Sequence, residues 1–136
     1  MNIKLETALE VIAAAKKKAM EIGVPMVIAV ADTGGNLLAL QRMDEALLVS
    51  IEIAANKAYT AVALKMPTEE LAKISQSGQP LFGINAVGGG KVIIFGGGIP
   101  LKKDGKIIGA IGVSGGSVED DVKCAQAGVA RLSELK

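Results

Sequence analysis

Apolar residues recur at spacings of three and four over several long segments of the chain, which is the pattern of amphipathic helices. The pattern predicts helices over residues 4–22, 45–64 and 117–135, and a shorter helix over 68–76. The apolar face of the second helix differs from the others because it consists mainly of alanine. A narrow face of small residues favours close packing of this helix against a neighbouring element.

Short apolar runs bounded by turn residues predict five β-strands. Residues 27–31 and 37–43 are expected to form one hairpin, and residues 99–103 and 106–113 a second, with a further strand over 91–95. An Asp-Gly dipeptide separates the last two runs, and this dipeptide suits a two-residue hairpin turn. Hairpins without βαβ crossovers predict an α+β fold with a mainly antiparallel five-stranded sheet flanked by helices.

The length of 136 residues predicts one domain, spanning residues 1–136. Half of the residues are hydrophobic, yet the chain has only two Phe, one Tyr and no Trp. The core is therefore expected to consist of Ala, Val, Ile and Leu. Residues 77–90 contain five glycines and one proline, and a loop is expected there.

The charge pattern limits the kinds of partner that the protein is expected to bind. Fifteen basic and fourteen acidic residues give a net charge of +1 without a run of like charge, which argues against nucleic acid. No apolar run is long enough to predict a membrane span, and the amphipathic start of the chain does not resemble a signal peptide. The single cysteine, Cys124, excludes an internal disulfide and is expected to be buried and inert. These features predict a cytoplasmic protein.

The absence of histidine restricts the possible chemistry. One cysteine and no histidine cannot form a zinc site of the usual kind, so no metal site is predicted. The segment Gly112-Val113-Ser114-Gly115-Gly116 matches the G-x-S-x-G nucleophile motif, but the chain lacks the histidine base that such a serine needs. A tight turn is the favoured interpretation of this segment.

Two other glycine-rich segments give weak phosphate-binding motifs. Gly88–Lys91 resembles the end of a P-loop but lacks the following Ser or Thr, and Gly96–Gly98 lacks the third glycine of a dinucleotide fingerprint. The start of the last helix is expected to be capped by Ser117 and the residues after it, which leaves the amides of Ser114 and Gly115 available for a ligand.

Lys57 is the leading polar candidate, and the only catalytic candidate, because it borders the alanine-rich helix face. It points either into a cleft or along the surface, and the two interpretations have similar weight. Arg42 binds a carboxylate or caps local carbonyl groups. The opposite wall of the cleft is expected to be the turn at residues 96–98. The predicted ligand-binding residues are Arg42, Lys57, Thr60, Gly97, Gly98, Ser114 and Gly115.

Motifs along nearly the whole chain resemble the GlcG/HbpS family, which includes the C-terminal domain of PduO. The motifs are Asp32-x-x-Gly35-x-Leu37, Arg42-Met43-Asp44, Ser50, Lys57-Ala58-x-Thr60-Ala61, Gly96-Gly97-Gly98-Ile99-Pro100-Leu101, Asp104-Gly105 and the segment Gly109–Gly116. The resemblance implies a profilin- or PAS-like sandwich that forms homo-oligomers. Some members bind haem, take part in its degradation or sense iron, and others accompany diol or glycolate metabolism.

Three functions are compatible with the residues and the resemblance. The leading hypothesis is a binding protein for a small molecule, haem or a corrinoid-related compound, associated with diol or glycolate metabolism. The second is an enzyme that acts on a small acidic or diol-derived metabolite through Lys57, and the third is a non-catalytic oligomeric accessory protein. The cofactor stays unknown, because haem would need Tyr59, Met43, Lys57 or Thr60 as a ligand, or would be held without a strong axial bond.

Overall fold

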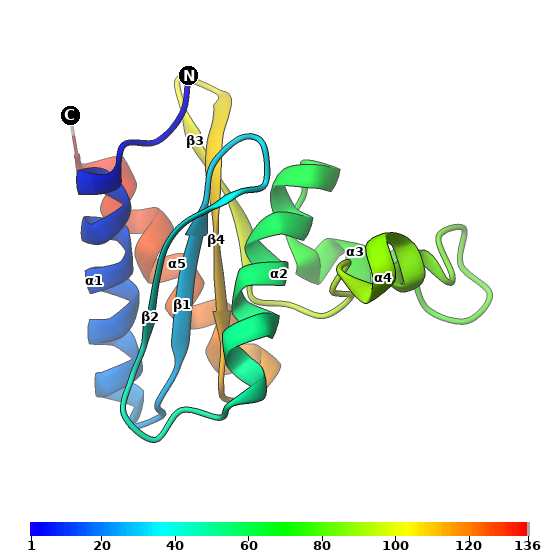
Figure 1. The fold of residues 1–136 in the computed structure, drawn as a ribbon, viewed down its shortest axis with the longest axis horizontal. Helices are drawn as coiled ribbons and strands as arrows, with labels where there is room; N and C mark the ends of the chain where they lie inside the picture. The colour runs from blue at the N-terminus through cyan, green and yellow to red at the C-terminus, as the bar shows by residue number, and fades with distance from the viewer. Residues whose placement is uncertain (136) are drawn as a thin grey trace.

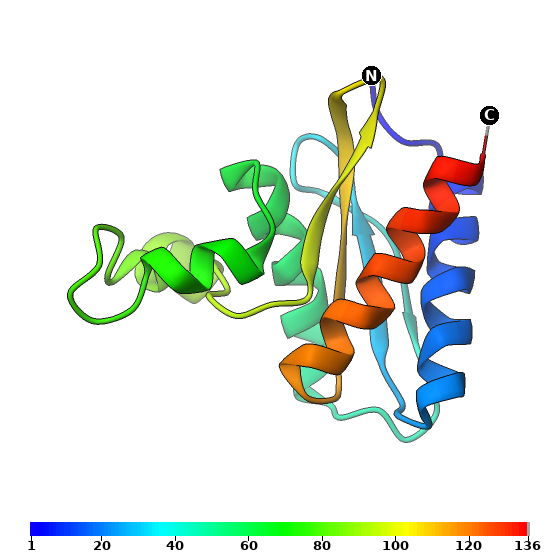
Figure 2. The same ribbon diagram turned by 180° about the vertical axis from the view of Figure 1, so that it is seen from behind.

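The computed structural model describes residues 1–135. A four-stranded antiparallel sheet with the strand order β2-β1-β4-β3 forms the middle layer. The helices α1 and α5 lie side by side on one face of the sheet, and α2 covers the other face (Figures 1 and 2). The elements are α1 (Leu5–Ile22), β1 (Val27–Ala31), β2 (Leu37–Arg42), α2 (Val49–Leu64), α3 (Thr68–Ile74), the 3-10 helix η1 (Ile84–Ala86), α4 (Val87–Gly90), β3 (Gly98–Lys103), β4 (Lys106–Ser114) and α5 (Val118–Glu134).

The hairpin between β3 and β4 forms as its turn residues predict. Asp104 and Gly105 have φ angles of 52° and 76°, so both turn positions adopt the left-handed conformation that a type I′ turn requires. The strands then pair from Lys103 opposite Lys106 to Gly98 opposite Gly112. The first predicted hairpin is also confirmed, since β1 and β2 pair antiparallel.

The prediction of five strands is wrong at residues 91–95, because the described chain has four strands and this segment is not one of them. The segment runs along α2, and the Ile93 amide donates to the Thr60 hydroxyl at 3.0 Å. The Lys91 amide donates to the Val87 carbonyl at 3.2 Å. Hydrogen-bond partners in the helices α2 and α4 therefore take the place of a neighbouring strand. A short apolar run of this kind does not reveal from sequence which partner it takes.

Several element boundaries also differ from the prediction, most of them by one or two residues, and the third helix ends at Ile74 and not at residue 76. The second helix begins at Val49 and not at residue 45, because Glu45 has a φ of 69° and the Ala46 amide donates to the Met43 carbonyl in a turn. The expected loop over residues 77–90 contains η1 and the single turn α4.

Side chains alternate between the two faces of the sheet. Ile28 and Val30 pack towards α1 and α5, whereas Val27 and Ala29 pack towards α2. The face under α2 carries small residues, and a Cβ atom at Gly112 would collide with the backbone of α2. The alanine-rich face of α2 therefore lies close to the sheet. No helix within residues 1–135 has both the length and the apolar character needed to cross a bilayer.

Candidate functional site

A buried ion pair joins α2 to the start of α5. The Lys57 side chain is fully enclosed, and its Nζ donates to Asp121 Oδ2 and to the Val113 carbonyl, both at 2.8 Å. The second carboxylate oxygen, Asp121 Oδ1, accepts a hydrogen bond from the Gly116 amide at 2.9 Å. The Phe95 ring covers the ammonium group, with its centroid 5.0 Å from Nζ. The pair therefore links α2, the end of β4 and the first turn of α5.

The position of this pair shifts the protonation equilibria of both groups. Burial lowers the pKa of Lys57 below its ordinary value of 10.5, and the neighbouring carboxylate of Asp121 opposes this shift. Burial likewise raises the pKa of Asp121 above 3.8, opposed by Lys57 and by the hydrogen bond from Gly116. Desolvation acts against both charges, while the 2.8 Å contact between them acts in their favour.

The segment that covers Lys57, residues 91–97, is called the strap below. At its end, Gly97 has a φ of 128°, and a Cβ atom there would lie 2.6 Å from Lys57 Nζ. The next residue, Gly98, donates its amide to the Thr68 hydroxyl at 2.9 Å. Glycine is needed at Gly97 both for this φ and for the space that the lysine occupies.

Thr60 anchors the other end of the strap from inside α2. The residue is 1% exposed, and its hydroxyl donates to the Asn56 carbonyl at 2.7 Å and accepts from the Ile93 amide at 3.0 Å. The predicted binding residue Thr60 is thus already occupied by contacts within the chain.

The turn after β4 is likewise engaged. The Ser114 hydroxyl donates to the Ser50 hydroxyl at 3.0 Å in a buried contact. At Gly115 a Cβ atom would lie 2.5 Å from the Pro25 carbonyl, so the neighbouring backbone covers this position. The predicted cap on α5 forms, because Ser117 accepts from the Asp120 amide at 3.1 Å.

The structure gathers six of the seven predicted residues around α2 and one end of the sheet. Lys57, Thr60, Gly97, Gly98, Ser114 and Gly115 form this group. Arg42 lies two strands away from Ser114 at the same end of the sheet, with Val27 of β1 between them, and its side chain lines a different groove. Sequence reasoning missed Asp121 as the partner of Lys57, although the run of three acidic residues in the first turn of α5 was the available signal.

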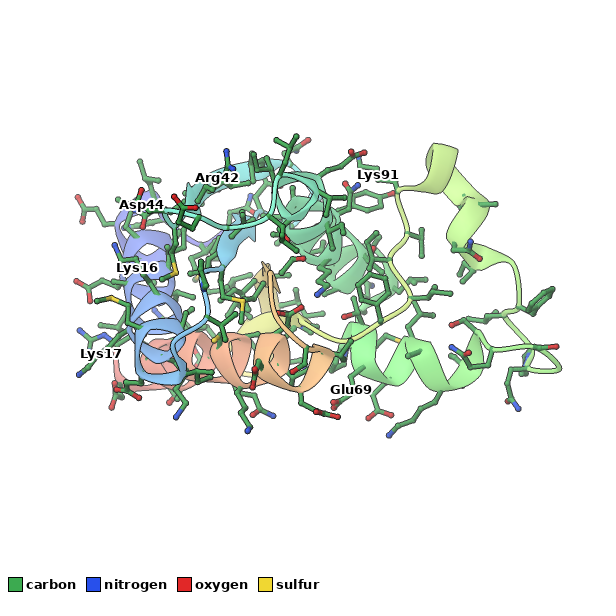
Figure 3. All side chains as sticks on the ribbon, turned by 90° about the horizontal axis from the view of Figure 1, so that it is seen from below. Lys16, Lys17, Arg42, Asp44, Glu69 and Lys91 are labelled. Atoms are coloured by element: carbon green, nitrogen blue, oxygen red, sulfur yellow. The ribbon has the colours of Figure 1, made fainter. Side chains whose placement is uncertain are left out.

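Arg42 lines a separate groove of about 730 Å³ between α1 and the end of β2, called the basic groove below. Its Nη2 donates to the Ala46 carbonyl at 3.1 Å, and Lys16 Nζ donates to Gln41 Oε1 at 3.3 Å. Figure 3 shows Lys16, Arg42 and Asp44 near one another at this end of the molecule. The apolar lining consists of Ala19, Met20, Val24, Pro25 and Met43. The groove thus combines an apolar wall with two cations and one carboxylate.

Gly97 and Gly98 line a second, smaller pocket of about 260 Å³ on the outer side of the strap. Its walls are mainly apolar, with Glu69 and Gln126 at the edge. The apolar wall residues are Pro67, Ile99, Val122 and Val129. This apolar pocket, at about 260 Å³, has less than half the volume of the basic groove, which is about 730 Å³.

The remaining donors do not form a metal centre. Within residues 1–135, no three His, Cys, Asp or Glu side chains are grouped so that they could hold a metal ion. Cys124 is buried, as expected, and burial raises the pKa of its thiol to about 11 from 9.0.

The fold defines a small α+β domain in which one antiparallel sheet separates a helix pair from a single helix. The chain belongs to the family described as Haem degrading protein HbpS-like, which matches residues 3–130. This result confirms the family that the sequence motifs indicated.

Known proteins resemble this chain over most of its length. It is 45% identical to Corrinoid adenosyltransferase PduO of Salmonella typhimurium over 88% of this chain, but it spans only 36% of PduO. The crystal structure of Klebsiella pneumoniae protein ORFY superposes with a TM-score of 0.96 at 46% identity, covering 98% of this chain and 92% of ORFY. The crystal structure of a PduOC:heme complex gives a TM-score of 0.92 at 41% identity, covering 96% of this chain and 95% of PduOC.

Proposed function

We propose that this protein binds a flat, largely apolar small molecule with carboxylate groups, of the tetrapyrrole class, in the basic groove. Haem and corrinoid-related compounds are the leading ligands of this class. The observation that carries the proposal is an apolar groove of about 730 Å³ with Lys16 and Arg42 beside it. The similarity to PduOC, whose structure contains heme, supports the same ligand class.

The residues of the groove match the two parts of such a ligand. Apolar contacts with Met20, Val24 and Pro25 would cover a macrocycle, because burial of apolar surface is the main favourable term in binding. Lys16 and Arg42 would face the carboxylates, and the guanidinium of Arg42 suits a carboxylate in particular. Asp44 lowers the net charge of the groove lining to +1. Binding of a ligand with two carboxylates would therefore need both Lys16 and Arg42.

Two methionines, Met20 and Met43, line the groove, so a thioether sulfur would be available to hold haem iron. When bound, haem would supply an iron centre that accepts a side-chain donor such as methionine sulfur. The Met20 side chain lines the groove and its residue is 67% exposed, whereas Met43 Sδ already accepts from the Met26 amide at 3.4 Å. Among the four ligands that the sequence suggested, only Met43 lines this groove.

The proposal is tested by titrating micromolar protein with haem and, separately, with iron-free protoporphyrin. We expect a Soret shift with haem and fluorescence enhancement with protoporphyrin. Lys16→Ala and Arg42→Ala should each weaken both affinities about tenfold, the loss of roughly one charge-assisted contact. Lys17→Ala is the matched control, because Lys17 lies on the same helix but lines a different groove, between α1 and α5.

A separate variant, Met20→Leu, tests whether the protein coordinates haem iron. Met20→Leu should change the Soret position of bound haem and leave protoporphyrin binding unchanged, because only haem contains the metal. Absence of any spectral change with either porphyrin would refute the proposed function. Equal affinities for the Lys16, Arg42 and Lys17 variants would refute the basic groove as the site.

Within residues 1–135, no contact favours the alternative of a Lys57-based enzyme, because the Lys57 amine is enclosed and already donates to two acceptors. We assign Lys57 a structural role, which is to hold the end of β4, the first turn of α5 and the strap in one arrangement. The association with diol or glycolate metabolism stays a prediction.

A further inference from the structure

The apolar pocket lies on the outer side of the strap, between α3 and α5. Figure 3 shows Glu69 where the start of α3 meets the start of α5, and this residue lies at the edge of the pocket. The pocket shares no lining residue with the basic groove, so the two cavities are separate. Its volume is about 260 Å³, and an apolar cavity of roughly 150 Å³ is enough to hold benzene. A six-membered ring with a short substituent therefore matches the size of the pocket.

The backbone of Gly97 leaves the hydrogen-bond ladder of the sheet at the wall of this pocket. The Val113 amide donates to the Gly97 carbonyl at 2.9 Å, as in a hydrogen-bonded antiparallel pair. The return bond from the Gly97 amide to the Val113 carbonyl is not formed, and Lys57 Nζ donates to that carbonyl at 2.8 Å instead. The φ of 128° at Gly97 lies outside the range of a β-strand, so the backbone turns where the ladder is interrupted.

The Gly97 amide is consequently a donor without an acceptor. Gly97 is buried, and its amide forms no hydrogen bond within the part of the chain that the structure describes. The neighbouring amide of Gly98 differs, because it donates to the Thr68 hydroxyl at 2.9 Å. A buried backbone amide without a partner is unfavourable, and nearly all such groups in folded proteins are paired. A ligand oxygen in the pocket would supply the missing acceptor.

The charge at the pocket favours an uncharged ligand. Glu69 is the charged residue of the lining, and no Lys or Arg side chain among residues 1–135 forms an ion pair with it. Glu69 would repel a ligand carboxylate placed at the Gly97 amide. A ligand ammonium group has no acceptor to offer that amide. A carbonyl or hydroxyl oxygen satisfies both conditions.

We propose that the apolar pocket binds a small uncharged molecule with one carbonyl or hydroxyl oxygen, and that this oxygen accepts a hydrogen bond from the Gly97 amide. The side chains of Ile99, Val122 and Val129 would cover the apolar part of the ligand. Binding at this site does not depend on the ligand proposed for the basic groove, because the two cavities have different linings.

The test is an NMR titration of the full-length protein with three probes of similar shape. Acetophenone has a carbonyl oxygen, α-methylstyrene has a methylene group in its place, and benzoate has a charged carboxylate. The amide signals of Gly97, Val122 and Val129 report binding in this pocket and not in the basic groove. We expect a Kd of about 1 mM or tighter for acetophenone, a value within reach of a ligand with about ten non-hydrogen atoms.

The other two probes should bind more weakly, for different reasons. The affinity for α-methylstyrene should be about fivefold lower, because one hydrogen bond is lost. Benzoate should bind more than about tenfold more weakly, because its charge lies near Glu69. The Gly97 amide proton should move downfield with acetophenone and not with α-methylstyrene. Absence of acetophenone binding at these signals would overturn the site, and equal affinities for acetophenone and α-methylstyrene would overturn the role of the Gly97 amide. Benzoate binding as tight as that of acetophenone would overturn the preference for an uncharged ligand.

A pair of variants tests the location of the site. Gln126 is exposed at the pocket edge, so Gln126→Trp should obstruct the pocket and weaken acetophenone binding about tenfold or more. Lys123→Trp is the matched control, because Lys123 is exposed on the same helix but does not line the pocket, and it should keep the wild-type affinity. Circular dichroism verifies that both variants are folded. An unchanged affinity for Gln126→Trp, or equal losses in the two variants, would overturn the pocket as the binding site.

Discussion

Replacing Lys57 by methionine removes one charge of the buried pair and keeps most of the apolar stem of the side chain. Asp121 then keeps only its hydrogen bond from the Gly116 amide, and the Val113 carbonyl loses its contact with Nζ. Because Asp121 is only 3% exposed, water does not replace the lost ammonium group. The variant therefore contains a buried carboxylate without a compensating charge.

The expected loss is about 3–5 kcal/mol in the free energy of unfolding, the typical cost of leaving one member of a buried ion pair alone. Domains of this size have a total stability of about 5–15 kcal/mol, so the loss is a large fraction. The double variant Lys57→Met/Asp121→Asn should recover part of it. Asparagine keeps an acceptor for Gly116 but has no charge, and unpaired charge is the main cost in the single variant.

The assay is urea unfolding followed by circular dichroism, with Lys73→Met as the matched control. Lys73 pairs with Glu70 at 3.1 Å, but the two side chains are 67% and 53% exposed. Such a surface pair contributes at most about 1 kcal/mol, so the control should stay close to the wild type. A Lys57→Met variant as stable as the Lys73→Met variant would refute the reasoning.

The pH dependence of Lys57→Met supplies a second measurement. Burial raises the pKa of Asp121, and removing Lys57 removes a group that opposes this shift. The folded variant then binds more protons than the unfolded chain between the ordinary pKa of 3.8 and the raised value. The contribution of Asp121 to the stability of the variant therefore increases as the pH falls through the raised pKa, and the deficit relative to the wild type should shrink. A deficit that grows on acidification would contradict this explanation.

Three other positions give direct tests. Gly97→Ala should lower the free energy of unfolding by more than about 1 kcal/mol, and by more than Gly105→Ala does. The reason is that a Cβ atom at Gly97 meets Lys57 Nζ, whereas a Cβ atom at Gly105 meets open space. Equal losses for the two variants in urea unfolding would contradict this. Thr60→Val should cost about 1–3 kcal/mol by leaving the Ile93 amide without its acceptor, measured in the same way. Cys124 should resist iodoacetamide at pH 8 in the folded protein and react in urea, because burial raises the pKa of its thiol to about 11. Mass spectrometry counts the label on each form. Rapid labelling of the folded protein would contradict the burial of Cys124.

The sequence predicted the parts of the fold that depend on local signals. The Asp104-Gly105 turn fixed the second hairpin, because both residues favour a positive φ. The helical periods of α1 and α5 were equally clear. The strap was misread as a strand because a short apolar run does not specify its partner, and here the hydroxyl of Thr60 takes the place of a strand neighbour.

The candidate site was harder to predict because it depends on contacts between distant segments. A helical wheel places Lys57 at the border of a small-residue face, where a cleft and the surface are both compatible with the pattern. Its true environment is determined by Asp121, 64 residues away, and by the missing side chain at Gly97. Neither contact has a signature in the spacing of residues. The groove beside Arg42 similarly depends on α1, which the chain pattern does not place next to β2.

The strap connects the buried pair to the segment of residues 76–90 that precedes it in the chain. Side-chain hydroxyls of α2 and α3 anchor the strap near both of its ends, because Thr60 accepts from the Ile93 amide and Thr68 accepts from the Gly98 amide. Lys57 lies directly beneath Gly97 between these anchors, with the Phe95 ring over its ammonium group. A buried charge pair is a poor source of net stability, but its strict geometric demands favour one arrangement of the groups around it. The arrangement that Lys57 and Asp121 favour is the one in which the strap covers the ammonium group, with Gly97 and the Phe95 ring against it.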